Sequence, residues 1–181
     1  MLVDLDLYTE KKVFANKIVE KKDSADYYFV TKRHILPLAQ KIVRNFGGYY
    51  DPNAQLFSRN HLTSRDLFRL NVVVCVAPFK EKDVVFVDDQ LVLITGTGKL
   101  ITGFNLIKGK KYTFTYDEKT KDNIKVMKKY KTTVSKIIPE LEILEPETYQ
   151  PVSAKNPKEI SLKLGQNIKV VEHEKEFYVV G

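Results

Sequence analysis

The segment from Asp26 to Val76 constrains the fold of this chain more than any other part of the sequence. It opens with a short run of strand-forming residues and continues into an apolar stripe with helical spacing that stops at Gly47-Gly48. Two further runs of strand-forming residues follow, at 49–58 and 67–76, joined by the basic stretch 59–66. The pattern predicts a strand, a helix stopped by two glycines, and two more strands.

Another strand precedes this segment. Residues 12–20 are rich in strand formers, and the turn-like residues 21–24 connect them to the run 26–30, so a hairpin is expected. The resulting order of strand, strand, helix, strand, strand predicts one helix packed on an antiparallel sheet.

The predicted helix has one internal conflict. Thr31 is a plausible N-cap and Gly47 suits a left-handed C-cap. Pro37 lies between them, and inside a helix it removes a backbone donor at a cost of about 3 kcal/mol. The helix is therefore expected either to begin after Thr31 or to kink at Pro37. The apolar stripe of this predicted helix consists of Ile35, Leu38, Ala39, Ile42, Val43 and Phe46.

After Pro78 the pattern changes to short strands with closely spaced turns, which is typical of a small barrel. Residues 124–138 fit a long strand or a short helix, and the prolines at 146, 151 and 157 indicate an irregular stretch. A final hairpin is expected to close the barrel. The predicted strands are 84–87, 90–95, 99–105, 111–116, 141–144, 167–171 and 176–180.

These patterns predict an α+β fold that is mostly β. An antiparallel sheet with one main helix occupies residues 1–76, and a small β-barrel region of the OB or Src-homology type occupies residues 77–181. Hydrophobic residues make up 43% and charged residues 29% of the chain, as in ordinary globular proteins. No apolar run approaches the roughly 18 residues of a membrane-spanning helix, and the N-terminus lacks a signal-peptide pattern, so a cytoplasmic location is expected.

The chain carries a net charge of +7 that is unevenly distributed. Lys and Arg outnumber Asp and Glu by 12 to 8 in residues 1–76 and by 13 to 7 in residues 77–139, but residues 140–181 hold 5 against 8. A local excess of positive charge favours a polyanionic partner such as nucleic acid. Lysine-rich solvated faces, common in heat-stable proteins, are the alternative.

Motifs for catalysis or metal binding are weak. Gly96-Thr97-Gly98-Lys99 lacks the spacing and the following helix of a phosphate-binding loop, so it predicts a hairpin turn. The single cysteine, Cys75, has no partner for a disulfide or for zinc spacing and is expected to be a buried strand residue. The carboxylate pairs 88–89 and 117–118 are expected in turns facing solvent. We therefore expect no enzymatic activity, no cofactor and no metal.

The basic segments are the candidate binding residues. Positive side chains at a helix start are unfavourable unless an anion binds there, and arginine suits bidentate phosphate contact. Residues 108–136 hold ten Lys with interleaved aromatic residues; Phe114 is expected in the core, whereas Tyr112 and Tyr116 suit either the core or base stacking. The candidate nucleic-acid-binding residues are Lys32, Arg33, Arg59, Arg65, Arg69, Lys108, Lys110, Lys111, Lys128 and Lys129.

Five segments of the chain carry a family resemblance. They are Asp26-Tyr27-Tyr28-Phe29, Phe46-Gly47-Gly48, Ser64-Arg65-Asp66-Leu67-Phe68-Arg69, Pro78-Phe79-Lys80-Glu81-Lys82-Asp83-Val84-Val85 and Pro146-Glu147-Thr148-Tyr149. These segments resemble the archaeal Nmd-three proteins, which are similar to the eukaryotic export adaptor of the large ribosomal subunit. The family's cysteine-rich zinc-binding region is absent from this sequence, and Lys82 replaces the family's usual glycine.

The resemblance implies a translation-factor-five-A-like module that binds and does not catalyse. It implies association with the large ribosomal subunit, through ribosomal RNA and ribosomal proteins, in late maturation or quality control. The alternative from the residues alone is a protein–protein interaction module without direct RNA contact, in which the acidic C-terminal part meets a basic protein.

Overall fold

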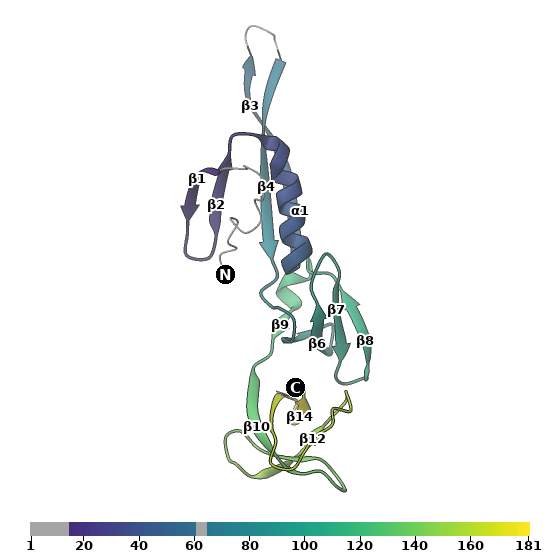
Figure 1. The fold of residues 1–181 in the computed structure, drawn as a ribbon. Helices are drawn as coiled ribbons and strands as arrows, with labels where there is room; N and C mark the ends of the chain where they lie inside the picture. The colour runs from purple at the N-terminus through teal and green to yellow at the C-terminus, as the bar shows by residue number, and fades with distance from the viewer. Residues whose placement is uncertain (1–14, 61–64) are drawn as a thin grey trace. The chain divides into compact units, whose positions relative to one another are not determined.

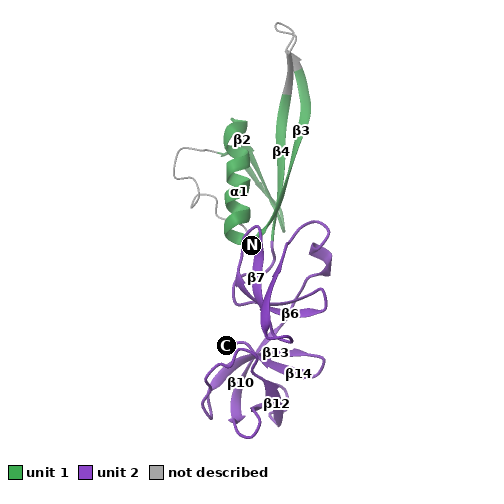
Figure 2. Cartoon of the chain, turned by 90° about the vertical axis from the view of Figure 1, so that its right-hand side faces the viewer, with its two compact units in different colours: residues 1–76 green, residues 77–181 purple. Residues whose placement is uncertain are grey.

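The computed structural model describes residues 15–60 and 65–181, with side chains described for all of these except 59–60 and 65–67. The chain divides into two compact units, residues 1–76 and residues 77–181 (Figure 2). It is mostly β, with one main helix, antiparallel sheets and a closed five-stranded barrel, which confirms the predicted fold class. None of the helices in the described ranges has the length and apolar character that crossing a bilayer requires.

The first unit contains two hairpins and the helix (Figure 1). In the described residues the two hairpins form separate two-stranded sheets, whereas the sequence suggested a single sheet. Its elements are β1 (Ala15–Glu20), β2 (Ala25–Phe29), the 3-10 helix η2 (Lys32–His34), α1 (Ile35–Phe46), β3 (Gly48–Asn60) and β4 (Arg65–Val76).

The start of the helix resolves the conflict at Pro37. The turn after Thr31 is a 3-10 helix, and the α-helix begins only at Ile35, so Pro37 lies in its first turn. Backbone N–H groups there have no intrahelical acceptor, and proline therefore removes no bond. The predicted cap is wrong in detail, because Thr31 makes no side-chain capping hydrogen bond and His34 occupies the N-cap of α1.

Two glycines end the helix, as predicted, but Gly47 is not in the left-handed helical conformation, since its φ is 75° and its ψ is 159°. Its N–H donates to the Val43 carbonyl at 2.9 Å. Gly48 has a φ of 128°, and a Cβ at this position would lie 2.1 Å from the Cys75 carbonyl oxygen. Only glycine lets β3 begin this close to the end of β4.

The β3–β4 ribbon packs one face against α1. Along β4, Leu70, Val72 and Val74 are half-buried and alternate with the exposed Asn71 and Val73. This period of two is typical of a strand with one covered face. On the helix, Ala39, Ile42 and Val43 are buried, which follows the predicted apolar stripe.

The ribbon is longer than the sequence indicated. Arg59 pairs with Asp66 and Asn60 pairs with Arg65, so residues predicted as a connecting loop extend the strands. The pairing changes from Leu56–Phe68 to Ser58–Leu67, which leaves Phe57 as the extra residue of a β-bulge. Figure 1 shows the ribbon continuing past the N-terminal end of α1. His61 and residues 62–64 lie outside the described residues.

The second unit begins with a five-stranded sheet in the order β8-β7-β6-β5-β9. Asp88 and Asp89, both with positive φ, form the two-residue turn between β5 and β6, which is the predicted hairpin connection. One side of the sheet buries a core that includes Val85, Ile94 and Phe114. The strands are β5 (Val84–Val87), β6 (Gln90–Gly96), β7 (Ile101–Asn105), β8 (Lys110–Phe114) and β9 (Lys125–Val126).

A closed barrel in the order β10-β11-β12-β14-β13 follows, and the predicted closure by the final hairpin is confirmed. Residues 124–138, left open between helix and strand, hold β9 and β10. The stretch predicted to be irregular contains β12, which pairs antiparallel with β11 and parallel with β14. The strands are β10 (Lys129–Lys136), β11 (Glu142–Leu144), β12 (Pro151–Lys155), β13 (Asn167–His173) and β14 (Glu176–Val179).

The sheet and the barrel share a buried apolar cluster. Leu91 and Leu106 of the sheet region pack in it with Val171 and Tyr178 of the barrel. Beside it, the rings of Phe86 and His173 lie 4.8 Å apart. Burial of side chains this large holds the two halves of the second unit together.

Candidate nucleic-acid interface

The turn between β7 and β8 presents the first group of candidate lysines. Asn105 is only 2% exposed, and its Oδ1 accepts the backbone N–H groups of Ile107 and Lys108, each at 2.9 Å. Its Nδ2 donates to Gln90 Oε1 at 2.5 Å. Gly109 has a φ of 64° and its N–H donates to the Asn105 carbonyl at 3.0 Å. A buried amide and a glycine therefore set the shape of this turn.

Lys108, Lys110 and Lys111 project from this turn and from the edge strand β8, and all three are exposed. Within the described residues, none of them forms an ion pair. Lysines on an edge strand also hinder pairing with a second sheet. The three ammonium groups are available to an external anion.

The aromatic residues between these lysines belong mainly to the core. Phe114 is buried, as predicted, and Tyr112 and Tyr116 pack against the same cluster. Tyr112 Oη donates to Asp88 Oδ2 at 3.0 Å, and burial together with this bond raises the pKa of the Tyr112 phenol. This packing assigns both tyrosines, which the sequence left open, to the core side.

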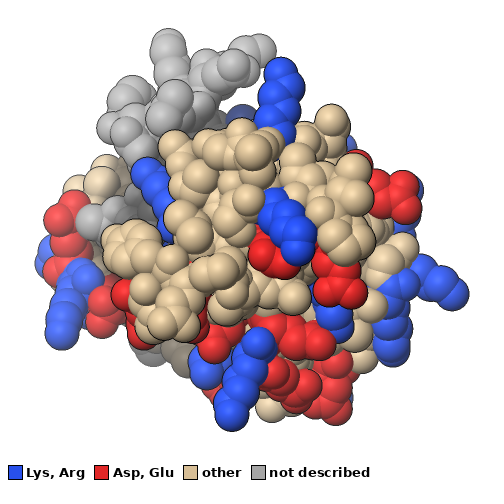
Figure 3. All heavy atoms as spheres, turned by 90° about the horizontal axis from the view of Figure 1, so that it is seen from below, with Lys and Arg blue, Asp and Glu red and all other residues tan. Residues whose placement is uncertain are grey.

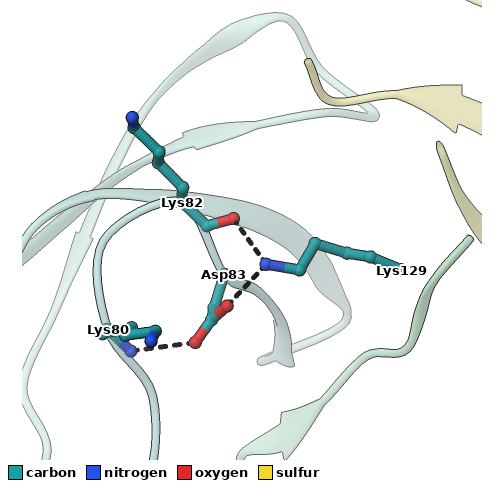
Figure 4. A network of polar contacts seen from close by, with 4 residues as sticks. All are labelled: Lys80, Lys82, Asp83 and Lys129. Atoms are coloured by element: carbon teal, nitrogen blue, oxygen red, sulfur yellow. Dashed lines mark hydrogen bonds and ion pairs between the residues drawn. The ribbon is translucent and has the colours of Figure 1, made fainter. Parts of the chain in front are cut away.

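Lys129 has a structural partner (Figure 4). Its Nζ lies 2.6 Å from Asp83 Oδ1 and 3.2 Å from the Lys82 carbonyl oxygen, while the Lys80 N–H donates to Asp83 Oδ2 at 3.1 Å. Partial burial of Asp83 works to raise its pKa, but the bonds from Lys129 and Lys80 outweigh it and lower the pKa. The ion pair ties the start of β10 to the turn before β5, so a phosphate has to compete with Asp83 for Lys129.

Lys128 and Lys131, on either side of Lys129, form no ion pair in the part of the chain that the structure describes, whereas Lys136 at the end of β10 pairs with Glu142. Lys128 Nζ lies 4.8 Å from the centre of the Tyr130 ring, a cation–π contact. Lys131 lies directly opposite Lys169 of β13, and both are exposed. Like charges in this arrangement are unfavourable. The candidate set missed Lys169, since only the strand register brings it beside Lys131.

In the first unit, Lys32 and Arg33 lie in η2 and are exposed, and the first turn of α1 contains no acidic residue. The Arg69 guanidinium lies 3.3 Å from the centre of the Phe57 ring. Near the far end of the β3–β4 ribbon, Arg59 pairs with Asp66 and Arg65 pairs with Asn60. The side chains of both arginines lie outside the described residues.

The second unit is not uniformly basic. On the face shown in Figure 3, acidic and basic side chains intermingle. A groove of about 610 Å³ in the barrel is lined by apolar residues that include Leu141, Val152 and Phe177, by four glutamates and by two lysines, Lys155 and Lys175. The glutamates are Glu140, Glu145, Glu172 and Glu176.

One of these glutamates is held in a network. Glu176 Oε2 accepts bonds from Lys155 Nζ at 2.6 Å and from Tyr178 Oη at 2.7 Å. These two bonds lower the pKa of Glu176. Burial and the bond to Glu176 raise the pKa of Tyr178 to about 12.

Histidines and carboxylates form no metal-binding group in the described part of the chain, where no group of three His, Cys, Asp or Glu is arranged to hold a metal ion. His34 is exposed in η2, and His173 stacks on Phe86. Asp117 caps a turn by accepting the N–H groups of Lys119 and Thr120, each at 3.0 Å.

No family model matches the chain, and no curated protein matches its sequence. Among solved structures, eukaryotic translation initiation factor 5A from Methanococcus jannaschii is similar, with a TM-score of 0.39 and 14% identity over 57% of this chain and 87% of that one. A translation initiation factor eif-5a family protein from Naegleria fowleri gives a TM-score of 0.31 and 17% identity over 58% and 92%. Similarities this distant carry no argument about function.

Proposed function

We propose that this chain is a non-enzymatic binding protein of the cytoplasm that associates with the large ribosomal subunit by contacting ribosomal RNA. The observation that carries the proposal is the group of exposed lysines on the β7–β8 turn, whose backbone is fixed by buried Asn105. Lysines without carboxylate partners on a rigid turn suit phosphate groups. The like-charged pair of Lys131 and Lys169 supports the same partner, because a phosphate between them removes their repulsion.

The finer part of the proposal rests on the resemblance of the sequence to the Nmd-three proteins. It comprises family membership, ribosomal proteins as additional partners and a role in late maturation or quality control. The basic turn supports RNA contact in general, and the motifs around residues 26–29 and 78–85 carry the link to the large subunit.

The proposal is tested by sedimentation of the chain with purified large subunits at rising salt. Each neutralised phosphate contributes about 0.7 to 0.9 to the slope of log affinity against log salt. Replacing Lys108, Lys110 and Lys111 together by Gln is expected to weaken binding and reduce this slope by about 2 to 3. The matched control removes the same charge at Lys22, Lys158 and Lys163, which are exposed and do not line the groove in the barrel. Binding that is insensitive to salt contradicts the proposal.

The groove in the barrel favours a second candidate, a protein-interaction module. Its lining combines apolar residues with four glutamates against two lysines, and this acidic excess complements a peptide that carries both apolar and basic residues. Replacing Glu140 and Glu172 by Gln would then weaken binding to a ribosomal protein after nuclease treatment. Unchanged binding in that assay, together with loss of RNA binding in the lysine variant, excludes this candidate.

A further inference from the structure

The β3–β4 ribbon exposes large apolar side chains where it extends past α1. Leu56, Phe57 and Phe68 are 61%, 55% and 53% exposed. Leu56 and Phe68 lie side by side, because they pair across the ribbon, and Phe57 is the bulge residue that follows Leu56 on the other face. We call these three residues, with Arg69, the ribbon tip cluster. Adjacent exposed apolar side chains of this size mark an interaction surface.

The bulge places aromatic rings on both faces of the ribbon. Phe68 and Leu56 continue the face that carries Leu70 and packs against α1. Phe57 lies on the opposite face, where it contacts Arg69. The neighbouring residues on this face are polar, and Asn71 Nδ2 donates to Gln55 Oε1 at 3.1 Å. The guanidinium covers one side of the Phe57 ring and leaves a stacked pair open to solvent.

The charge of this part of the chain selects the partner. The segment from Leu56 to Arg69 contains three arginines, Arg59, Arg65 and Arg69, and one acidic residue, Asp66. A net positive segment with exposed aromatic rings is complementary to a polyanion that also offers flat apolar surfaces. Unpaired RNA has both properties, and its bases stack on aromatic side chains and on guanidinium planes.

We propose that the ribbon tip cluster binds unpaired RNA, with bases stacked on Phe57 and Phe68 and Arg69 holding the Phe57 ring. The inference rests on the proposed function and adds a second mode of contact to it. The lysines of the β7–β8 turn neutralise phosphates, whereas the cluster recognises exposed bases. The chain is therefore expected to bind single-stranded RNA, loops or bulges more tightly than a continuous duplex.

The test compares binding of the full chain to a single-stranded RNA oligonucleotide and to a duplex of equal length. Phe57→Leu and Phe68→Leu keep apolar area but remove the aromatic face, so each is expected to weaken single-strand binding about tenfold. Phe57→Tyr and Phe68→Tyr keep the ring and are the matched controls, which are expected to bind like the original chain. Both positions are exposed, and circular dichroism checks that the four variants fold.

The salt dependence separates stacking from charge. The Leu variants are expected to lower affinity with an unchanged salt slope, because no phosphate contact is lost. Leu variants that bind single strands like the original chain, while that chain binds RNA, overturn the inference and leave the proposed function standing. The inference is also overturned if the Leu variants lose binding to a ribosomal protein but keep binding to RNA. Failure of the original chain to bind any RNA overturns both.

Discussion

Lys131 and Lys169 face each other across the β10–β13 pair, although both carry a positive charge. Direct cross-strand repulsion costs about 0.2 to 1 kcal/mol, so the pair lowers the stability of the free barrel. This cost is removed when an anion lies between the two ammonium groups.

We predict that Lys169→Glu stabilises the free chain by about 0.5 kcal/mol and weakens RNA binding. Stability is measured by urea unfolding, and binding by sedimentation with large subunits. Lys163→Glu makes the same charge change at an exposed position outside the strands and serves as the control. A Lys169→Glu variant that is less stable and binds equally well contradicts the interpretation of this pair.

The Asp83–Lys129 ion pair predicts a pH dependence of stability. The pKa of Asp83 is lower in the folded chain than the unfolded value of about 3.9. Its contribution is thus fully present above that value and is lost as the pH falls through the folded pKa. Asp83→Asn is expected to lower the free energy of unfolding by about 1 kcal/mol at neutral pH.

The difference between Asp83→Asn and the original chain is expected to shrink in acid, because protonation of Asp83 removes the negative charge that the Asn variant lacks at every pH. Unfolding by urea at neutral pH and at acidic pH measures the two differences. Asp122→Asn, at an exposed carboxylate of η3, controls for a general change in charge. A difference between the variants that persists unchanged in acid argues against the ion pair as its source.

Asn105→Ala is expected to destabilise the chain by about 2 to 3 kcal/mol, because it removes a buried amide that accepts from two backbone N–H groups and donates to Gln90. The variant is also expected to weaken RNA binding, since the turn that carries Lys108 loses its support. Thermal unfolding and RNA titration are the two measurements. Asn123→Ala, at an exposed side chain, is expected to change neither.

Gly48→Ala and Gly109→Ala compare two glycines with positive φ. A methyl group at Gly48 meets the Cys75 carbonyl, whereas at Gly109 nothing lies within 4 Å. Gly109→Ala is expected to cost about 1 kcal/mol from backbone strain alone, and Gly48→Ala more than about 3 kcal/mol. Equal losses of stability in chemical denaturation contradict the clash at Gly48.

The sequence predicted the elements that depend on local patterns. The hairpin turn at 88–89, the helix end at Phe46 and the closing hairpin of the barrel all follow from turn residues and periodicity. It did not predict β12, because strand pairing with β14 overrides the local signal of Pro151. It also placed Arg59 in a loop, since polar residues in an exposed ribbon lack the alternation that marks a half-buried strand.

The candidate site was predicted by residue type rather than by arrangement. The lysines of the β7–β8 turn are exposed, but Lys129 has a carboxylate partner that lies 46 residues away in the sequence. Lys169 and the ribbon tip cluster depend on strand register and on a bulge, which one-dimensional patterns do not encode. The structure thus adds pairing information that composition lacks.

The β7–β8 turn separates the residues that determine its shape from those that determine its charge. Asn105 and Gly109 determine the backbone conformation of the turn. The side chains of Lys108, Lys110 and Lys111 take no part in the hydrogen bonds that Asn105 makes. Substitutions at these three lysines would therefore change the affinity of the turn for an anion, or make it prefer a cation, without changing its backbone. The turn is in this sense a graftable loop, in which a chosen charge pattern can be installed without redesigning the fold.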